Sequence, residues 1–409
     1  MNRCRFCDKQ LKYTFADLGV SPLANSYLTT EQTNQMEPFF PLRAYVCERC
    51  FLVQLPVFQS SEEIFSEYAY FSSYSDSWLQ HAKKYSESMI ERFGFGIKSQ
   101  IIEIASNDGY LLRNFLEKGF SVLGIEPAKN VAEAAIDIGI PTVVKFFGVQ
   151  TAKELVLDGK YADLLIGNNV LAHVPDVNDL IKGMKIILKP QGIITMEFPH
   201  LMRLIDENQF DTIYHEHFSY FSFTTVRQIF MHHDFKIFDV EELPTHGGSL
   251  RIYACHSEDH SKETTKRVDN LLEREEVAGF KDLKIYLDFD EKVKTIKRSI
   301  LSFVNKAKNE GNSIVGYGAP AKGNTLLNYC GIRKDYIDYT VDRSPHKQGY
   351  FLPGTHIPIY HPDKIKETQP DYIVILPWNL KDEIMKQMAH IREWNGRFVT
   401  LIPEVSIHS

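Results

Sequence analysis

The chain has 409 residues, of which 44% are hydrophobic and 24% are charged, and it carries a net charge of −7. This length exceeds a single ordinary core, so two or three domains are expected, and the acidic balance without a long Lys/Arg block argues against a nucleic-acid or anionic-membrane surface. No apolar stretch reaches the roughly 18–20 residues of a membrane span, and the N-terminus lacks an apolar signal core, so we expect a cytoplasmic protein.

Four of the six cysteines form two tight pairs near the N-terminus, Cys4 with Cys7 and Cys47 with Cys50. A two-residue spacing lets both thiolates of a pair reach one ion, and two such pairs complete a tetrahedral zinc shell. Because four protein ligands leave no open position, the predicted zinc is structural. The alternative is a pair of redox dithiols, which use the same spacing.

A segment rich in aromatic and hydroxyl side chains, residues 67–75, follows the cysteines at an expected domain boundary. Loops at domain junctions often line ligand sites, so Tyr68 and Tyr70 are candidates for the lid or wall of a substrate site. A packed linker that contacts no ligand explains the same composition equally well.

The next stretch has the pattern of a nucleoside-binding βαβ unit. A helix is expected over 78–93, a buried parallel strand over 99–105, and a tight turn over 106–109. A second strand, 121–126, ends in Glu126. The interval from the turn to this acid is close to the ~20 residues of units whose turn passes under a ligand and whose acid accepts ribose hydroxyls.

The turn departs from the dinucleotide-binding pattern, because Ala105 and Asn107 stand where glycines are expected. Side chains there hinder the close approach of the backbone to a pyrophosphate. A ligand that has a ribose but no phosphate remains compatible with the turn, and S-adenosylmethionine is the ligand we expect.

Polar residues also follow the later strands of this region. A third strand, 162–167, ends in Asn168 and Asn169, and His173 comes soon after. A strand over 192–197 precedes His200. Open α/β sheets bind their ligands beyond the carboxyl ends of such strands, so these residues are predicted to face one cleft.

Residues 214–217 read Tyr-His-Glu-His inside an aromatic and apolar run. Imidazole and carboxylate together move protons near neutral pH, so this row is a candidate catalytic cluster. If the row is extended, His215 and His217 share a face from which Glu216 points away. A hydrogen-bonded core network is one alternative, and chelation of a catalytic zinc by the two histidines is another.

The C-terminal third begins with a charged, helix-patterned stretch, clearest over 262–308, that reads as one long or two shorter helices linking domains. A strand over 313–318 then enters a glycine turn, and a helix starts at Lys322. Further strands are expected over 336–341, 372–376 and 397–402, which makes a second small Rossmann-like unit. Its turn and Lys322 could bind a phosphate, or the turn could be purely structural.

Taken in order, these motifs resemble those of the sugar C-methyltransferases of deoxysugar pathways, over nearly the whole chain. Besides the cysteine pairs, the resemblance rests on Glu-Ile-Ala-Ser-Asn-Asp-Gly at 103–109, Gly-Ile-Glu-Pro at 124–127, Gly-Asn-Asn-Val-Leu-Ala-His-Val-Pro at 167–175, Ile-Tyr-His-Glu-His-Phe-Ser-Tyr at 213–220, Thr-His-Gly-Gly-Ser-Leu-Arg at 245–251 and Gly-Tyr-Gly-Ala-Pro-Ala-Lys-Gly-Asn at 316–324. Members of that family use S-adenosylmethionine and a structural zinc to methylate a ring carbon of a dTDP-linked keto-deoxysugar; we expect C-3 of a 4-keto sugar.

The resemblance implies an α/β protein of four parts. We expect a zinc-binding module with its linker over 1–75, a class I (Rossmann-like) methyltransferase domain that binds S-adenosylmethionine over 76–260, a helical connector over 261–310 and a second Rossmann-like domain over 311–409.

The same motifs imply three sets of site residues. We predict His217 as general base, Glu216 as its orienting group, and Tyr214 with His173 as partners of an enolate oxygen, although these roles could be exchanged. The residues predicted to bind the cofactor are Glu103, Ala105, Ser106, Asn107, Gly109, Glu126, Pro127, Asn168 and Asn169. The residues predicted to bind substrate are Tyr68, Tyr70, His246, Lys322, Asn324 and Arg343.

Three other functions compete with this interpretation. An NAD-dependent sugar oxidoreductase or epimerase fits the Rossmann-like units but lacks the glycine pattern, and a zinc-containing nucleic-acid methyltransferase fits the zinc module but lacks a basic surface. A non-enzymatic binding module leaves residues 214–217 unexplained. The expected partner is a small nucleotide sugar, with no nucleic acid and no membrane; the oligomeric state is left open, with a monomer as the working expectation.

Overall fold

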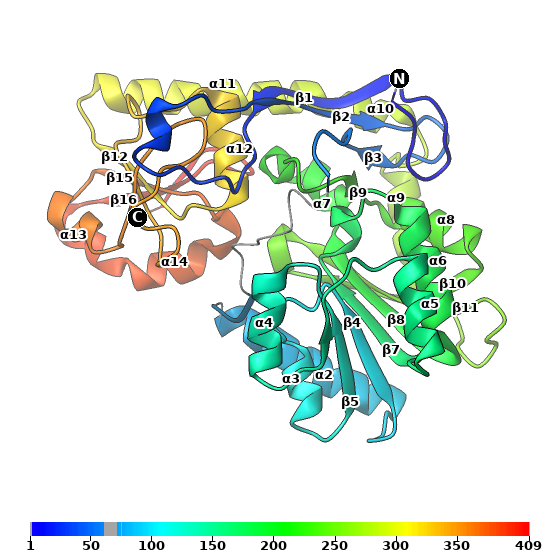
Figure 1. The fold of residues 1–409 in the computed structure, drawn as a ribbon. Helices are drawn as coiled ribbons and strands as arrows, with labels where there is room; N and C mark the ends of the chain where they lie inside the picture. Colours follow the sequence, from blue (N-terminus) through cyan, green and yellow to red (C-terminus); the bar gives the residue numbers. More distant parts are fainter. Residues whose placement is uncertain (1, 61–71, 75, 409) are drawn as a thin grey trace.

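The computed structural model of the protein describes residues 2–60, 72–74 and 76–408, so the predicted substrate residues Tyr68 and Tyr70 lie outside the described residues. Three β-sheets organise this part of the chain (Figure 1). Every helix that the structure describes is too short or too polar to cross a lipid bilayer.

The N-terminal sheet contains one strand that comes from far along the chain. Its order is β1 (Tyr13–Ser21), β2 (Phe40–Val46), β3 (Val53–Gln54) and β9 (Ser219–Tyr220). Because β9 directly follows residues 214–217, the N-terminal sheet holds one end of the predicted catalytic row. A short 3₁₀ helix, η1 (Gln32–Asn34), lies in the loop between β1 and β2.

The central sheet has seven strands in the order β10-β11-β8-β7-β4-β5-β6, all parallel except β11. Its strands are β4 (Gln100–Ile104), β5 (Ser121–Ile125), β6 (Thr142–Val143), β7 (Ala162–Asn168), β8 (Leu188–Pro199), β10 (Phe235–Leu243) and β11 (Ser249–His256). The inner strands are apolar on both faces, as a sheet covered on both sides requires. The strands predicted at 99–105, 121–126, 162–167 and 192–197 all lie in this sheet.

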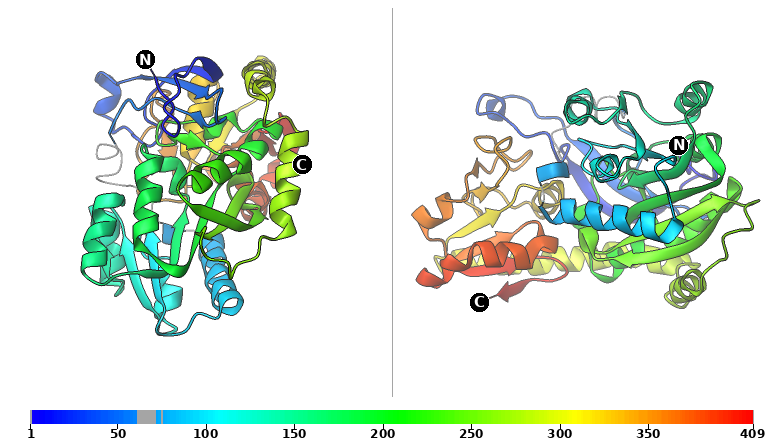
Figure 2. Two further views of the ribbon diagram at one scale, coloured as in Figure 1. Left: turned by 90° about the vertical axis from the view of Figure 1, so that its right-hand side faces the viewer. Right: turned by 90° about the horizontal axis from the view of Figure 1, so that it is seen from below.

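Helices cover the two faces of this sheet (Figures 1 and 2). Two of them begin at side-chain caps: Asp176 accepts from the Asp179 amide, and Ser222 accepts from the Thr225 amide. The helices are α2 (Asp76–Phe93), α3 (Leu112–Leu116), α4 (Lys129–Asp137), α5 (Val149–Leu157), α6 (Val177–Ile187), α7 (Leu201–Asp206) and α8 (Phe223–His232), with 3₁₀ turns η3 (Leu171–His173), η4 (Phe210–Thr212) and η5 (Thr245–Gly247).

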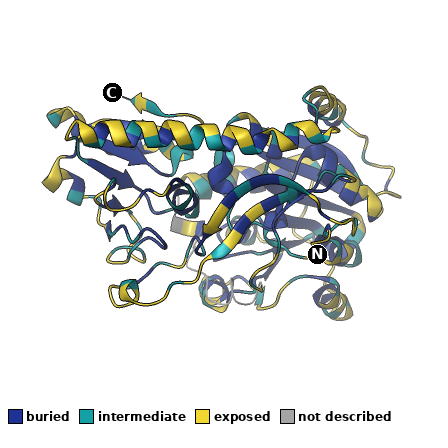
Figure 3. Cartoon of the chain, turned by 90° about the horizontal axis from the view of Figure 1, so that it is seen from above, coloured by how far each residue is buried: buried dark blue, intermediate teal, exposed yellow. Residues whose placement is uncertain are grey.

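The charged connector forms three helices rather than one or two: α9 (Lys266–Val277), α10 (Leu283–Leu287) and α11 (Phe289–Asn309). The chain breaks at Gly279, whose φ is +92°, and α10 starts where Asp282 accepts from the Lys284 amide. The exposed face of α11 turns outward (Figure 3), while Phe289 stacks on Phe15 of β1 with ring centroids 4.6 Å apart.

The C-terminal domain is a second, smaller Rossmann-like sheet of order β14-β13-β12-β15-β16-β17, parallel except for β17. Its elements are β12 (Ile314–Tyr317), α12 (Ala321–Cys330), β13 (Thr340–Val341), β14 (Ile359–Tyr360), α13 (Lys364–Thr368), β15 (Tyr372–Ile375), η6 (Trp378–Leu380), α14 (Lys381–Gln387), η7 (Ala389–Trp394), β16 (Arg397–Thr400) and β17 (Ser406–His408). The strand predicted over 336–341 shortens to β13, because the amides of Tyr336 and Ile337 turn back to the Arg333 carbonyl. Strand β1 packs on both α11 and α12 and so links the N-terminal sheet to the C-terminal domain (Figure 1), while the pairing of β9 with β3 links this sheet to the central part of the chain.

Candidate active site

The four N-terminal cysteines converge as the spacing predicts. Their Sγ atoms all lie within 4.8 Å of one another, with Cys4 and Cys50 at 3.5 Å and Cys7 and Cys47 at 3.5 Å. Zn–S bonds of about 2.3 Å in a tetrahedron place sulfurs about 3.8 Å apart, so the set fits a zinc ion. Cys4, Cys47 and Cys50 are buried, which makes this a closed structural site.

The carboxyl ends of β4 and β5 carry a buried acidic pair. Neither oxygen of Glu103 has a hydrogen-bond partner within the described structure, and burial beside Glu126 and Asp108 raises the pKa of Glu103 well above its usual value. Glu126 accepts from the amides of Asn107 and Ala128, both at 2.9 Å, and thereby ties the turn to the end of β5. A buried carboxyl group without a partner is costly unless a ligand meets it, so this edge fits a bound cofactor.

The turn itself needs unusual backbone angles. Ala105, Asn107 and Gly109 have φ values of 55°, 50° and 76°, in the left-handed region. A Cβ atom on Gly109 would lie 2.9 Å from Ile140, so this position requires glycine, whereas Ala105 and Asn107 tolerate side chains. Ser106 is buried and its hydroxyl has no partner among the described residues.

Two asparagines continue this edge at the end of β7. The side chain of Asn168 is buried with no hydrogen bond inside the described part of the chain, as expected of a group that meets a ligand. Asn169 also bonds a neighbour, because its Nδ2 donates to His246 Nε2 at 3.1 Å, while its Oδ1 is buried without a partner among the described residues. Pro127 lies between Glu126 and the first turn of α4. The predicted cofactor residues therefore gather at one sheet edge.

Residues 214–217 form a turn rather than an extended strand. The His217 amide donates to the Tyr214 carbonyl at 2.9 Å, and this closes the turn. The turn brings the Tyr214 hydroxyl 2.9 Å from His217 Nε2, and the His173 ring lies 4.7 Å from the His217 ring, edge to face. Three of the four predicted catalytic side chains therefore meet. The turn makes this possible, because in an extended strand Tyr214 and His217 would point to opposite faces.

Hydrogen bonds define the tautomer of His217. Its Nδ1 lies 2.9 Å from the Thr212 carbonyl, which can only accept, so Nδ1 carries the proton and Nε2 accepts from Tyr214. Burial lowers the pKa of His217 well below its usual value and lowers the pKa of His173 to about 4. Both rings are therefore neutral at pH 7, and Nε2 of His217 can take a proton.

Glu216 does not orient His217 as we predicted. Its Oε1 accepts instead from Nδ2 of Asn25, at 2.7 Å, and Thr212 holds the imidazole in its place. The turn points the side chains of Glu216 and His217 in different directions. The Glu216 carboxylate therefore meets the N-terminal module instead of the neighbouring histidine. His215 points to β2, where its Nε2 donates to the Pro41 carbonyl at 3.2 Å.

His246 comes from a strained turn beside this cluster. It lies in η5 with a φ of 55°, and Thr245 anchors the turn by donating to Glu197 at 2.8 Å. Burial lowers the pKa of His246 to about 4, so this ring is neutral as well. A Cβ atom on Gly247 would overlap Trp378, and the turn therefore packs closely on the C-terminal domain.

The C-terminal domain contacts η4, just before the turn at residues 214–217, through a carboxylate that the sequence analysis missed. Asp211, in η4, is buried and accepts from Trp378 Nε1 at 2.7 Å, and burial raises the pKa of Asp211 to about 6. Lys322 lies 4.4 Å from the Trp378 ring centroid and donates to Asn379 at 2.8 Å. In the sequence, the feature that could have indicated Asp211 is its position three residues before Tyr214.

Two predicted substrate residues have different surroundings. Asn324 is buried and its Nδ2 donates to the Ala24 carbonyl at 2.6 Å, which ties the C-terminal domain to the N-terminal module, while its Oδ1 has no partner among the described residues. Arg343 is exposed and lies 3.8 Å from Glu383. Both follow a strand or turn that looked like a cleft wall, but helix α12 packs Asn324 inward and the Arg343 side chain extends into solvent.

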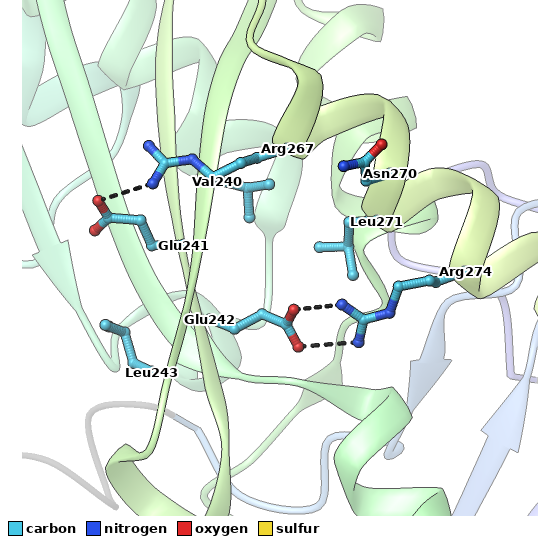
Figure 4. Close-up of a pocket in the computed structure, with 8 residues that line it drawn as sticks. All are labelled: Val240, Glu241, Glu242, Leu243, Arg267, Asn270, Leu271 and Arg274. Atoms are coloured by element: carbon cyan, nitrogen blue, oxygen red, sulfur yellow. Dashed lines mark hydrogen bonds and ion pairs between the residues drawn. The ribbon is translucent and has the colours of Figure 1, made fainter.

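A hollow of about 400 Å³ between β10 and α9 is lined partly by charged groups, and none of the predicted site residues lines it (Figure 4). Its two arginines are already paired, Arg274 with Glu242 at 3.1 Å and Arg267 with Glu241 at 3.6 Å. These pairs pin the connector helix to the outermost strand of the central sheet and offer no free charge to a ligand.

The seven-stranded sheet with one antiparallel strand, and an acid-bearing turn at its carboxyl edge, define a class I methyltransferase. The comparisons with known proteins agree. Three family models match: "Putative zinc binding domain" over residues 4–65, "Methyltransferase domain" over 77–240 and "C-methyltransferase C-terminal domain" over 244–403.

The chain is 34% identical over 410 residues to C-methyltransferase NovU of Streptomyces niveus, covering 100% of this chain and 97% of that protein. Ubiquinone biosynthesis O-methyltransferase of Bartonella tribocorum is 29% identical over 96 residues, which are 23% of this chain and 39% of that protein. A solved structure, magnesium protoporphyrin IX methyltransferase of Synechocystis with bound SAH, has a TM-score of 0.36 and 13% identity and covers 48% of this chain and 92% of its own.

The chain belongs to the S-adenosylmethionine-dependent C-methyltransferases that carry an N-terminal zinc-binding domain. It is an enzyme that transfers a methyl group to carbon, and its family membership favours this activity over the oxidoreductase and the nucleic-acid alternatives.

Proposed function

We propose that the enzyme methylates a ring carbon next to a ketone in a nucleotide-linked deoxysugar, with His217 as the general base. The observation that carries the proposal is the His217–Tyr214 pair, in which a neutral imidazole accepts from a phenol at 2.9 Å beside the cofactor edge. Transfer to carbon needs a carbon nucleophile, and a base that removes a proton next to a ketone makes one.

The hydrogen bonds of the pair suggest how the proton moves. A ketone oxygen that accepts the Tyr214 hydroxyl releases Nε2 of His217, which then takes the proton of the adjacent carbon while the electron pair moves to the oxygen. The phenol stabilises the enolate oxygen, and His173 lies close enough to His217 to share this role. S-adenosylmethionine, held by residues at the edge of β4, β5 and β7, supplies the electrophilic methyl group.

The identity of the substrate rests on family resemblance and on the C-terminal domain. The family resemblance implies a dTDP-linked 4-keto sugar methylated at C-3. Lys322, half-buried over Trp378 and next to the catalytic turn, supports a nucleotide end on the C-terminal side, since a lysine there can meet a phosphate. We therefore propose a small nucleotide sugar as the substrate.

A two-part experiment tests the proposal. Labelled S-adenosylmethionine is incubated with a panel of nucleotide keto-sugars, and the labelled carbon is located by NMR. Separately, exchange of the sugar α-hydrogen with deuterated water is followed without methyl donor. We expect label on a ring carbon next to the ketone, with exchange lost in H217A. Transfer to no sugar would contradict the substrate, and unchanged exchange in H217A would contradict the base.

A further inference from the structure

One side chain of the zinc knuckle reaches chain segments that adjoin the two histidines of the proposed site. Arg5 stands between the zinc ligands Cys4 and Cys7, and its guanidinium donates from Nη1 to the Pro175 carbonyl at 3.0 Å and from Nη2 to the Leu55 carbonyl. These two carbonyls belong to chain segments about 120 residues apart. The planar guanidinium meets the two carbonyls through two separate nitrogens in a fixed geometry, which the single ammonium nitrogen of a lysine does not reproduce.

The two segments bracket the histidine pair. His173 lies between Ala172 and Pro175, and His217 directly precedes Phe218. The Phe218 amide donates to the Ala172 carbonyl at 2.7 Å, and the Leu55 amide donates to the Phe218 carbonyl at 3.0 Å.

Together with Arg5, these contacts form a closed circuit. From Arg5 it passes to Pro175 and along the chain to Ala172. It then crosses to Phe218 and returns to Arg5 through Leu55. Arg5 also lies over the Phe218 ring, 5.5 Å from its centroid.

The backbone of the knuckle is held as tightly as the side chain. The Arg5 amide donates to Gln54 Oε1 at 2.9 Å, and the Arg5 carbonyl accepts from Asn178 Nδ2 at 3.1 Å. Gln54 in turn donates to Cys4 Sγ at 3.2 Å. A four-residue knuckle has no hydrophobic core of its own. Its zinc ligands therefore define the position of the Arg5 backbone, and these hydrogen bonds define the direction of the Arg5 side chain.

We propose that Arg5 is a positioning residue for the reaction, through which the structural zinc module sets the distance between the His173 and His217 rings. The inference deepens the proposed function and rests on its assignment of these histidines. It gives the zinc module a role in catalysis that does not require the metal to touch substrate.

The test compares three zinc-loaded variants of the full chain, R5A, R5K and R3A. Arg3 is the matched control, because it directly precedes the same knuckle and its exposed side chain bonds Asp8 instead of the segments next to the histidines. We expect R5A to keep its zinc and its affinity for S-adenosylmethionine, to lose kcat by at least about tenfold, and to regain part of it with added guanidinium. R5K should lose kcat without rescue, and R3A should behave as the wild type.

A second readout needs no substrate. In protein labelled at histidine, the ring signals of His173 and His217 should shift in R5A, return with guanidinium and stay unchanged in R3A. If R5A does not bind zinc, the result for R5K tests the proposal, because lysine keeps the positive charge and lacks the planar guanidinium. Wild-type ring signals and wild-type kcat in zinc-loaded R5K or R5A would overturn the proposal. Shifted rings in a protein that methylates no sugar would contradict the proposed substrate and leave the role of Arg5 intact.

Discussion

The cofactor edge and the histidine cluster of this enzyme are built in different ways. The cofactor edge uses residues at the ends of β4, β5 and β7, and Glu126 ties its turn together over an interval of 19 residues from Asn107. The histidine cluster draws on all three sheets: Asn25 reaches it from the N-terminal module, His173 and His217 from the central part, and Trp378 from the C-terminal domain.

This difference indicates that cofactor binding and proton transfer depend on different parts of the fold. The proposed cofactor edge is built by one local unit, whereas the proposed proton-transfer site needs contacts from the docked domains. Substitutions at the cofactor edge should therefore change affinity for S-adenosylmethionine, and substitutions at the cluster should change the rate of proton removal. Four experiments test whether the two functions can be changed separately.

The largest effect is expected from H217Q. Loss of the base should lower kcat by roughly 10²- to 10⁴-fold, while the Kd for S-adenosylmethionine measured by calorimetry stays unchanged. H361Q is the control, because His361 is 62% exposed on the C-terminal domain. A weakened cofactor affinity in H217Q would show that the two regions are not separate.

The reverse pattern is expected from E126Q. A charge-assisted hydrogen bond contributes about 1.5–3 kcal/mol, so the Kd for S-adenosylmethionine should rise roughly 10- to 100-fold. Hydrogen exchange at the sugar carbon, measured without methyl donor, should be unaffected. E154Q, on the exposed face of α5 where Glu154 pairs with Lys145, serves as control. Slowed exchange in E126Q would argue against a purely cofactor role.

A smaller effect is expected from W378F, which removes the hydrogen bond to Asp211. Because Asp211 adjoins Thr212, whose carbonyl holds His217, kcat should fall roughly three- to tenfold with unchanged cofactor affinity. W394F is a matched control, since Trp394 Nε1 donates to the Pro370 carbonyl at 3.0 Å in the same domain. Equal losses in both variants would point to a general loss of packing.

The smallest effect concerns pH. The pKa values of His173 and His246 are lowered to about 4, so between pH 6.5 and 4 the unfolded chain binds protons that the folded chain does not. The free energy of unfolding should therefore fall as the pH drops through this window, by about 1–2 kcal/mol per histidine at pH 5. Denaturant unfolding of wild type and H173N at pH 7 and pH 5 measures it; an equal loss in both would contradict the shift.

Much of the cofactor edge could be predicted, because its signals are local in sequence. Strand patterns, the turn at 106–109 and the spacing to Glu126 lie within one βαβ unit, and tertiary packing had little freedom to rearrange them. The zinc pairs were readable for the same reason, since a two-residue spacing specifies a knuckle wherever it is placed.

The histidine cluster was only partly readable. Residue types pointed to proton transfer, and the family resemblance implied a bend near His217, which the turn at residues 214–217 provides. The alternation of an extended strand could not supply that geometry. Asp211 and Asn25 belong to no recognisable motif, and the hydrogen bond by which Asn324 ties two domains together could not be predicted from its place in a glycine turn.

The order of residues alone was enough to predict a Cys₄ zinc site, a carboxylate at the end of a strand and a row of side chains able to exchange protons. Which of those side chains meet depends on the packing of distant segments. The pairing of β9 with β3 and the docking of Trp378 on Asp211 join residues more than 150 positions apart, and no local pattern encodes such contacts.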